Sequence, residues 1–253
     1  MGSIHAEDSM TYLFRPGHYN VTDSATARVY EPGGGGAAPT WWNPDGATPA
    51  ATCGAWQAKG AASLAVSYLN LATLGNANID PAVVGGVAPT WAAGTGWIFN
   101  GLSQYLQSGI IALTTTYSII IQFTGGIDAV FQCLAGAYRD AGGNASFALY
   151  NRHFLSQVAY ENGSIASFAL VPPRLDAGSL ALANKQGYRN GVSDGGAIPA
   201  GIPTNPQQVY VGAMNYNGGA IQFFTGNMIA LAIYNVTLTA PQVLARATAM
   251  SLL

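Results

Sequence analysis

Residues with carboxyl groups are the first to consider for catalysis, because glycoside hydrolysis needs two carboxyl groups held about 5 to 9.5 Å apart. The chain has three glutamates, Glu7, Glu31 and Glu161, and only Glu161 lies beyond the first 55 residues. Four aspartates of the rest of the chain stand where turns or strand ends are expected, and aspartate is a common turn residue: Asp128, Asp140, Asp176 and Asp194. We therefore expect no catalytic pair of carboxylates.

Nucleophilic catalysis has little support in the sequence. The chain contains no G-x-S-x-G elbow, and its histidines are His5, His18 and His153. His153, in the segment "NRHF", is a candidate general base. A single histidine near a strand end is more often a hydrogen-bonding surface residue. We therefore expect that the chain is not an enzyme.

Metal binding is not favoured either. Calcium prefers six to eight oxygen ligands, usually from several carboxylates, whereas the acidic residues here are scattered. Asp80, Asp194 and Asn217 could each contribute to a loop site, but Asx turns without a metal account for them better. Cys53 and Cys133 lack metal-binding spacing and are read as two buried thiols, with a disulfide between them left open. We expect no metal and no cofactor.

Tyrosines followed by arginine or asparagine are stronger candidates for functional residues, because they could bind carbohydrate. An exposed aromatic ring presents a flat apolar face, and amide and arginine groups beside it can hydrogen-bond hydroxyls. Four such clusters stand at expected strand ends, where loops carry function: Tyr138-Arg139-Asp140, Tyr150-Asn151-Arg152, Tyr188-Arg189-Asn190 and Tyr216-Asn217. The glycan-binding candidates are Tyr138, Arg139, Tyr188, Arg189, Tyr216 and Asn217. The alternative is that these tyrosines are half-buried structural residues.

Short apolar segments separated by Gly, Asn or Pro must position these side chains. Residues 63–71, 116–123 and 221–234 read as strands, and similar short runs lie between them. Many short strands at this spacing indicate an antiparallel sandwich or barrel. Asn190-Gly191 and Asn217-Gly218 predict tight hairpins, because both central residues of a type I′ turn need positive φ.

The segment "GWIFNGLSQYL", residues 96–106, tests whether an aromatic cluster belongs to a site or to the core. Strand alternation puts Trp97 and Phe99 on the same face, where we expect them to be packing residues. Tyr105 and Leu106 point to opposite faces, so both can be core only if both faces of their strand are covered.

One helix is expected, at the C-terminus. Residues 239–242, "TAPQ", form a capping box with proline in the first turn. An apolar stripe follows, and it predicts that the helix packs on the end or side of the sandwich: Val243, Leu244, Ala247 and Met250.

The first 55 residues differ from the rest. Residues 31–54 are rich in Gly and Pro, which break regular elements. A flexible linker would not need two adjacent tryptophans, yet Trp41 and Trp42 lie here and Tyr30 comes just before. We expect this arm to lie ordered against its own domain, a neighbouring subunit or another partner.

Composition excludes several function classes. Only 8% of the 253 residues are charged, against a typical share of about 25%, which fits a surface partly covered by neighbours, although uncharged polar residues also keep a surface wet. The net charge of −2 provides no basic field for nucleic acid. The longest apolar run, residues 228–234, is far shorter than the roughly 20 residues of a membrane span. The N-terminal residues have no basic and apolar regions typical of a signal peptide.

Four segments in order carry a family resemblance: "GWIFNGLSQYLQSG", "YSIIIQF", "YRNGV" and "GNMIALAIYNVTLTAPQV". They resemble the laminin-G-like, concanavalin A-like jelly-roll domain over about residues 60 to 250. The resemblance implies an all-β, antiparallel β-sandwich. Related glucanases carry their carboxylates as E-x-D-x-x-E, a motif that this chain lacks.

A narrower resemblance gives a biological context. Residues 54–72, "GAWQAKGAASLAVSYLNLA", followed by "GVAPTW" and "GWIFNG", resemble LamG-like proteins of phage and phage-like genomes. Such proteins are often associated with the virion or its tail. We expect an irregular arm over residues 1–55 and a LamG-like jelly roll over residues 56–253, with a short C-terminal α-helix.

The leading hypothesis is a non-enzymatic virion structural protein, a capsid decoration or tail-associated component made in the host cytoplasm without a signal peptide. Its expected partners are other virion subunits, including copies of itself, and not nucleic acid or a membrane. Tyr30, Trp41 and Trp42 would bury apolar surface in assembly, because tryptophan and tyrosine are enriched at interface hot spots. The alternative is a carbohydrate-binding module that recognises a host or environmental glycan.

Overall fold

The chain divides into two units, Met1–Thr40 and Trp41–Leu253, and every element discussed below belongs to the second. Residues 41–45 and the start of the first strand, up to Ala55, fall within the expected arm but are part of this second unit. Tyr30 lies outside the described residues. The computed structural model describes residues 40–45, 52–72, 80–81, 88–112, 116–126, 130–140, 145–154, 156–164, 168–198 and 207–253.

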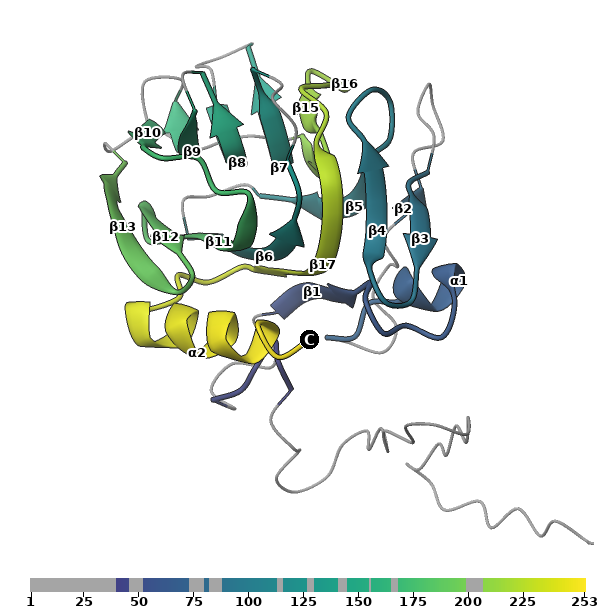
Figure 1. Ribbon diagram of the computed structural model, residues 1–253. Helices are drawn as coiled ribbons and strands as arrows, with labels where there is room; N and C mark the ends of the chain where they lie inside the picture. The colour runs from purple at the N-terminus through teal and green to yellow at the C-terminus, as the bar shows by residue number, and fades with distance from the viewer. Residues whose placement is uncertain are drawn as a thin grey trace, which may run out of the picture. The chain divides into compact units, whose positions relative to one another are not determined.

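Two β-sheets form the described part of this unit (Figure 1). The eight-stranded sheet has the order β13-β12-β11-β6-β17-β4-β3, with β1 beside β17. Its neighbouring strands are antiparallel. Its bounds are β1 (Thr52–Gln57), β3 (Thr90–Ala92), β4 (Gly96–Asn100), β6 (Ser118–Thr124), β11 (Ala177–Ala183), β12 (Gln186–Arg189), β13 (Val192–Ala197) and β17 (Thr225–Tyr234).

The second sheet has nine strands in the order β10-β9-β8-β7-β14-β5-β2, with β15 beside β7 and β16 beside β15. Its pairs are antiparallel except for β15, which runs parallel to β7. The structure thus confirms the expected all-β antiparallel sandwich. Its bounds are β2 (Asp80–Pro81), β5 (Leu106–Ile111), β7 (Gln132–Arg139), β8 (Ala145–His153), β9 (Gln157–Ser164), β10 (Phe168–Val171), β14 (Gln208–Val211), β15 (Met214–Tyr216) and β16 (Gly219–Ile221).

The main core contains side chains from both sheets. Trp97 and Phe99 of β4 are buried in it, as strand alternation predicted. Leu106 belongs to the same core, whereas Tyr105 stacks on Tyr210 in a separate cluster with ring centroids 4.7 Å apart. Both faces of the chain at Tyr105 and Leu106 are therefore covered.

Residues 63–71, expected as a strand, instead contain the short helix α1 (Leu64–Ser67). The Ser63 side chain caps it by accepting a hydrogen bond from the Val66 N–H at 3.2 Å. The Ser67 hydroxyl accepts a hydrogen bond from the Trp97 indole at 2.8 Å, which ties the helix to β4. The Ser63 cap and the contact with Trp97 therefore stabilise a helix where the partial alternation of apolar residues predicted a strand.

Both predicted hairpin turns are confirmed. Asn190 and Gly191 have φ of 51° and 80° between β12 and β13. Asn217 and Gly218 have φ of 52° and 94° between β15 and β16. Positive φ at both central residues is the property that makes Asn-Gly the favoured sequence for such turns.

Helix α2 (Ala240–Met250) packs on β6 and β11, outside the eight-stranded sheet (Figure 1). Gln242 accepts a hydrogen bond from the backbone N–H of Thr239 at 2.9 Å, as in the predicted capping box. Three residues of the predicted stripe are buried, but Leu244 is exposed. The buried face includes Arg246 instead, which an apolar pattern could not reveal.

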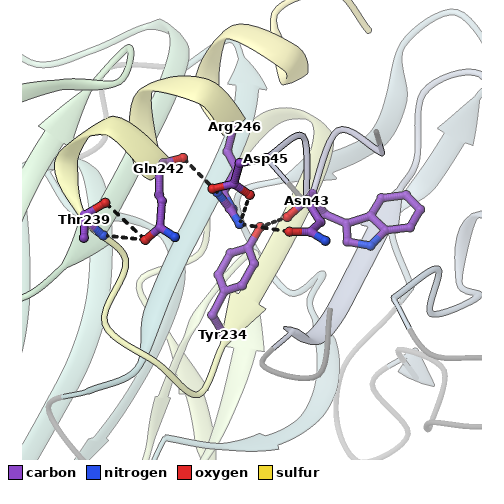
Figure 2. A network of polar contacts seen from close by, with 7 residues as sticks. Asn43, Asp45, Tyr234, Thr239, Gln242 and Arg246 are labelled. Carbon is purple, nitrogen blue, oxygen red and sulfur yellow. Dashed lines mark hydrogen bonds and ion pairs between the residues drawn. The ribbon is translucent and has the colours of Figure 1, made fainter. Parts of the chain in front are cut away.

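Arg246 joins α2 to the start of the unit (Figure 2). Its guanidinium is fully buried and donates from both terminal nitrogens to the carboxylate of Asp45, each at 3.2 Å. It also donates to the Asn43 side chain at 3.4 Å and to the backbone carbonyl of Gln242 at 3.0 Å, and lies 5.1 Å from the ring centre of Tyr234. Opposite charge, amide oxygens and a ring face together compensate the buried cation.

Trp41 and Trp42 are buried beside this network, packed edge to face with centroids 5.4 Å apart. They belong to an apolar cluster with β17 and α2, and the carbonyl of Trp42 accepts a hydrogen bond from Tyr234 at 2.8 Å. Both tryptophans thus pack within their own unit, one of the alternatives left open by the sequence. Their role in assembly stays a prediction, and these contacts do not support it.

Candidate functional site

The outer face of the nine-stranded sheet, away from the main core, carries the candidate site. Glu161, Ala148, Gly136 and Met214 are successive neighbours across β9, β8, β7 and β15. A Cβ atom on Gly136 would lie 2.8 Å from the Ala148 Cβ and 3.0 Å from the Met214 Sδ. Ala148 and Met214 therefore pack closely on Gly136 and leave no room for a side chain at this position.

A groove of about 560 Å³ lies on this face, with Glu161 and Met214 among its lining residues. Its volume falls in the usual range of small-molecule sites, about 300–1,000 Å³. Three of its apolar lining side chains are unusually exposed: Phe154 at 51%, Tyr216 at 38% and Ile221 at 38%. Its aromatic lining is Phe131, Tyr138, Tyr150, Phe154 and Tyr216, and its polar lining is Asp140, His153, Glu161 and Gln222.

A stacked tyrosine pair lines the groove. The parallel pairing of β15 with β7 places Tyr216 beside Tyr138, and the two rings are 5.1 Å apart and within 7° of parallel. Tyr216 donates a hydrogen bond to the Oδ2 atom of Asp140, and the Asn217 amide donates to the same atom at 3.1 Å. The backbone N–H of Asp140 donates to Asn217 at 3.1 Å. The structure thus brings together Tyr138, Tyr216 and Asn217 from two separate sequence clusters.

These contacts set the protonation states of the pair and the carboxyl group. The hydrogen bond from Tyr216, together with those from Tyr138 and Asn217, holds the pKa of Asp140 below its usual value. Burial and the neighbouring carboxylate of Asp140 raise the pKa of Tyr138 to about 12. At neutral pH the groove therefore has a charged Asp140 beside neutral tyrosine hydroxyls.

Glu161 provides a second carboxyl group in the groove. Burial raises its pKa to about 7, although a hydrogen bond from Ser146 acts in the opposite direction. The charges of Asp140 and of Glu161 both raise the pKa of Tyr138, so both groups lie near this ring. The sequence did not predict that these two carboxyl groups would share one site.

Histidine and glutamine complete the polar lining. Burial lowers the pKa of His153, which favours the neutral imidazole, and its Nδ1 atom is buried with no hydrogen-bond partner. Gln222 has a φ of 54°, a conformation that non-glycine residues rarely adopt. Its Oε1 atom accepts a hydrogen bond from the Tyr150 hydroxyl at 2.8 Å, and its backbone carbonyl accepts one from Cys133 at 3.0 Å. These bonds hold Gln222 at the groove.

Two of the sequence candidates lie on the other sheet. Tyr188 is buried in the cluster that includes α2. Arg189 forms an ion pair with Asp194 at 2.9 Å and donates to the carbonyl of Val171 at 3.3 Å. These structural contacts do not support glycan binding by Tyr188 and Arg189. Arg139 is not among the described residues that line the groove.

The sequence patterns did not predict several residues of the groove. Phe131, Phe154 and Gln222 come from segments that flank strands, and nothing local sets them apart. The sequence could have placed Glu161 on the outer face, because alternation along β9 puts it on the same face as Ala159 and opposite the core residues Val158 and Tyr160.

The described residues contain no group of three or more His, Cys, Asp or Glu side chains that could hold a metal ion. Within the same residues, no helix has the length and apolar character needed to cross a bilayer. Cys53 and Cys133 are both free thiols.

Comparisons with known proteins bear on the fold. No protein-family model and no curated protein matches the sequence. The structure is similar to domain 4 of AbnA, a GH43 extracellular arabinanase from Geobacillus stearothermophilus solved with arabinotriose, with a TM-score of 0.53 and 15% identity over 78% of this chain and 98% of that chain.

It is also similar to Trypanosoma rangeli sialidase in complex with sialic acid, with a TM-score of 0.51 and 13% identity over 79% of this chain. The match covers 32% of the sialidase chain, so this protein spans about a third of that length. At these identities the likeness establishes the fold alone. The chain shares a β-sandwich fold with domains found in glycoside hydrolases and sialidases.

Proposed function

We propose that this protein is a non-enzymatic carbohydrate-binding module whose ligand lies in the groove on the nine-stranded sheet. The observation that carries the proposal is the stacked pair of Tyr138 and Tyr216, which lines a groove of about 560 Å³ that also contains hydrogen-bonding groups. The fold shared with domains of carbohydrate-active proteins is compatible with this function but does not establish it.

The ring of Tyr216 supplies the apolar platform. One of its faces lies on Tyr138, and its hydroxyl is bound to Asp140, so the ring is held before any ligand arrives. Fixing a side chain in advance lowers the entropic cost of binding. A sugar ring would lie against Tyr216, with its hydroxyls bonded by Asp140, Gln222 and His153.

Binding measured by titration calorimetry tests the proposal, after a glycan array has identified a ligand. We expect Tyr216→Ala to weaken binding at least about tenfold, as for an aromatic hot spot. Val192→Ala is the matched control, because Val192 is an exposed apolar residue of the other sheet, and this variant should bind as the parent does. An array without ligands, or equal affinity of Tyr216→Ala and the parent, would refute the proposal.

The absence of catalysis is part of the proposal. Asp140 and Glu161 both line the groove, so each bound oligosaccharide should also be tested for hydrolysis. We expect no release of shorter sugars, and release that is lost in Glu161→Gln would contradict this.

A role as a virion structural protein, assembled with other virion subunits, rests on the sequence resemblance and stays a prediction. Display of a glycan-binding sandwich on a particle is compatible with it. Identification of the chain in purified particles would test that role.

A further inference from the structure

The charge of the groove is one-sided. Asp140 and Glu161 both line it, and its described lining residues include no lysine or arginine. His153 adds no positive charge at neutral pH, because burial lowers its pKa. Two carboxyl groups thus lie in one concave site whose described lining supplies no cation beside them.

The groups that contact these carboxyls are neutral donors. Asp140 accepts hydrogen bonds from Tyr216 and from Asn217. Glu161 accepts one from Ser146. Hydrogen bonds from neutral groups fix the orientation of a carboxylate but leave its negative charge uncompensated, unlike the buried Arg246, which is paired with Asp45.

The aromatic lining of the groove also favours a positively charged ligand. Ring faces carry a negative electrostatic potential and attract ammonium groups, and the exposed Tyr216 ring lies next to Asp140. A carboxylate beside ring faces is suited to an ammonium group attached to an apolar body. It is unsuited to a carboxylated or sulfated sugar, because like charges repel in a partly desolvated site.

The polar lining of the groove also suits a hydroxylated ligand. Gln222 and His153 line it together with the two carboxyl groups, and burial lowers the pKa of His153 and so favours its neutral imidazole. The buried Nδ1 atom of His153 is enclosed by protein and is not a contact for such a ligand. A polyhydroxylated ligand that also carries an amine would match both the polar lining and the carboxyl groups.

We propose that the groove selects amine-bearing sugars, with the ammonium group beside Asp140 and Glu161 and the sugar ring against Tyr216. This inference rests on the proposed carbohydrate-binding function and names its ligand class. Neutral sugars would gain the ring contact without the charge pairing, and acidic sugars would be repelled.

Calorimetry with two matched oligosaccharides tests the selection: a tetramer of glucosamine and the same tetramer fully N-acetylated, which lacks the positive charges. We expect the amine form to bind at least about tenfold more tightly at low salt, with the preference decreasing as salt screens the charges. Asp140→Asn keeps the acceptor for Tyr216 but removes the charge, and should reduce the preference to about twofold or less. Asp176→Asn removes the same charge from a carboxylate outside the groove and should leave the preference unchanged.

The outcomes separate this inference from the proposed function. If neutral oligosaccharides bind as tightly as the amine form, and Tyr216→Ala abolishes binding of both, the selection is refuted and the carbohydrate-binding function stands. If the amine form binds equally well to the parent, Asp140→Asn and Tyr216→Ala, it binds outside the groove and the inference is also refuted. If no oligosaccharide of any charge binds, both proposals fail.

Discussion

Replacing Glu161 with glutamine should stabilise the protein at alkaline pH. Burial of this carboxyl group raises its pKa from the usual 4.5 to about 7, because the surrounding strands and rings remove water that would solvate the charged form. Glutamine keeps the shape and one oxygen acceptor for the hydrogen bond from Ser146, but cannot ionise. The substitution therefore removes the cost of a charge in this position.

The magnitude follows from the difference between the two pKa values. Each pH unit corresponds to about 1.4 kcal/mol, so the raised pKa of Glu161 amounts to about 3 kcal/mol. Below pH 4.5 the carboxyl group is protonated in both the folded and the unfolded state, and no cost arises. Between about pH 4.5 and 7 the unfolded chain loses its proton first, so the parent loses stability as the pH rises. Above about pH 7 the cost is constant.

Urea denaturation at pH 4 and at pH 8 measures this effect. Relative to the parent, Glu161→Gln should have nearly unchanged stability at pH 4 and a gain of up to about 3 kcal/mol at pH 8. Asp140→Asn provides a control of opposite sign, because its hydrogen bonds lower the pKa of Asp140, and the charged form therefore stabilises the fold at pH 8. A gain for Glu161→Gln that is equal at both pH values, or a loss at pH 8, would refute the reasoning.

Two further predictions concern the start of the compact unit. Asp45→Asn should destabilise the protein by about 2–3 kcal/mol in the same denaturation assay, because it leaves the buried guanidinium of Arg246 without its counter-charge while Asp45 itself is partly exposed; an unchanged midpoint would contradict this. Deletion of residues 1–50 removes Asp45 and both buried tryptophans, and should lower the melting temperature below that of a chain that lacks only residues 1–40 and keeps them. Equal melting temperatures of the two truncated chains would show that residues 41–45 contribute nothing to stability.

The sequence by itself determined the class of fold. Apolar residues at alternate positions of a short strand, such as Trp97 and Phe99, lie on the same face of that strand. This face has to be buried, so the pattern predicts a sheet with a covered face. The Asn-Gly pairs at 190–191 and 217–218 determined two hairpins, because their positive φ is a local property. A local motif, the capping box of residues 239–242, likewise predicted the start of helix α2.

Only the tertiary structure decided the site. Tyr138 and Tyr216 are far apart in sequence, and the parallel pairing of β15 with β7 that stacks them has no local pattern. The raised pKa of Glu161 depends on what buries it, and burial is a property of the whole assembled face. The burial of Arg246 depends in the same way on Asp45, which lies at the other end of the chain. Local geometry is encoded by neighbouring residues, whereas the electrostatics of a groove are set by residues that only folding brings together.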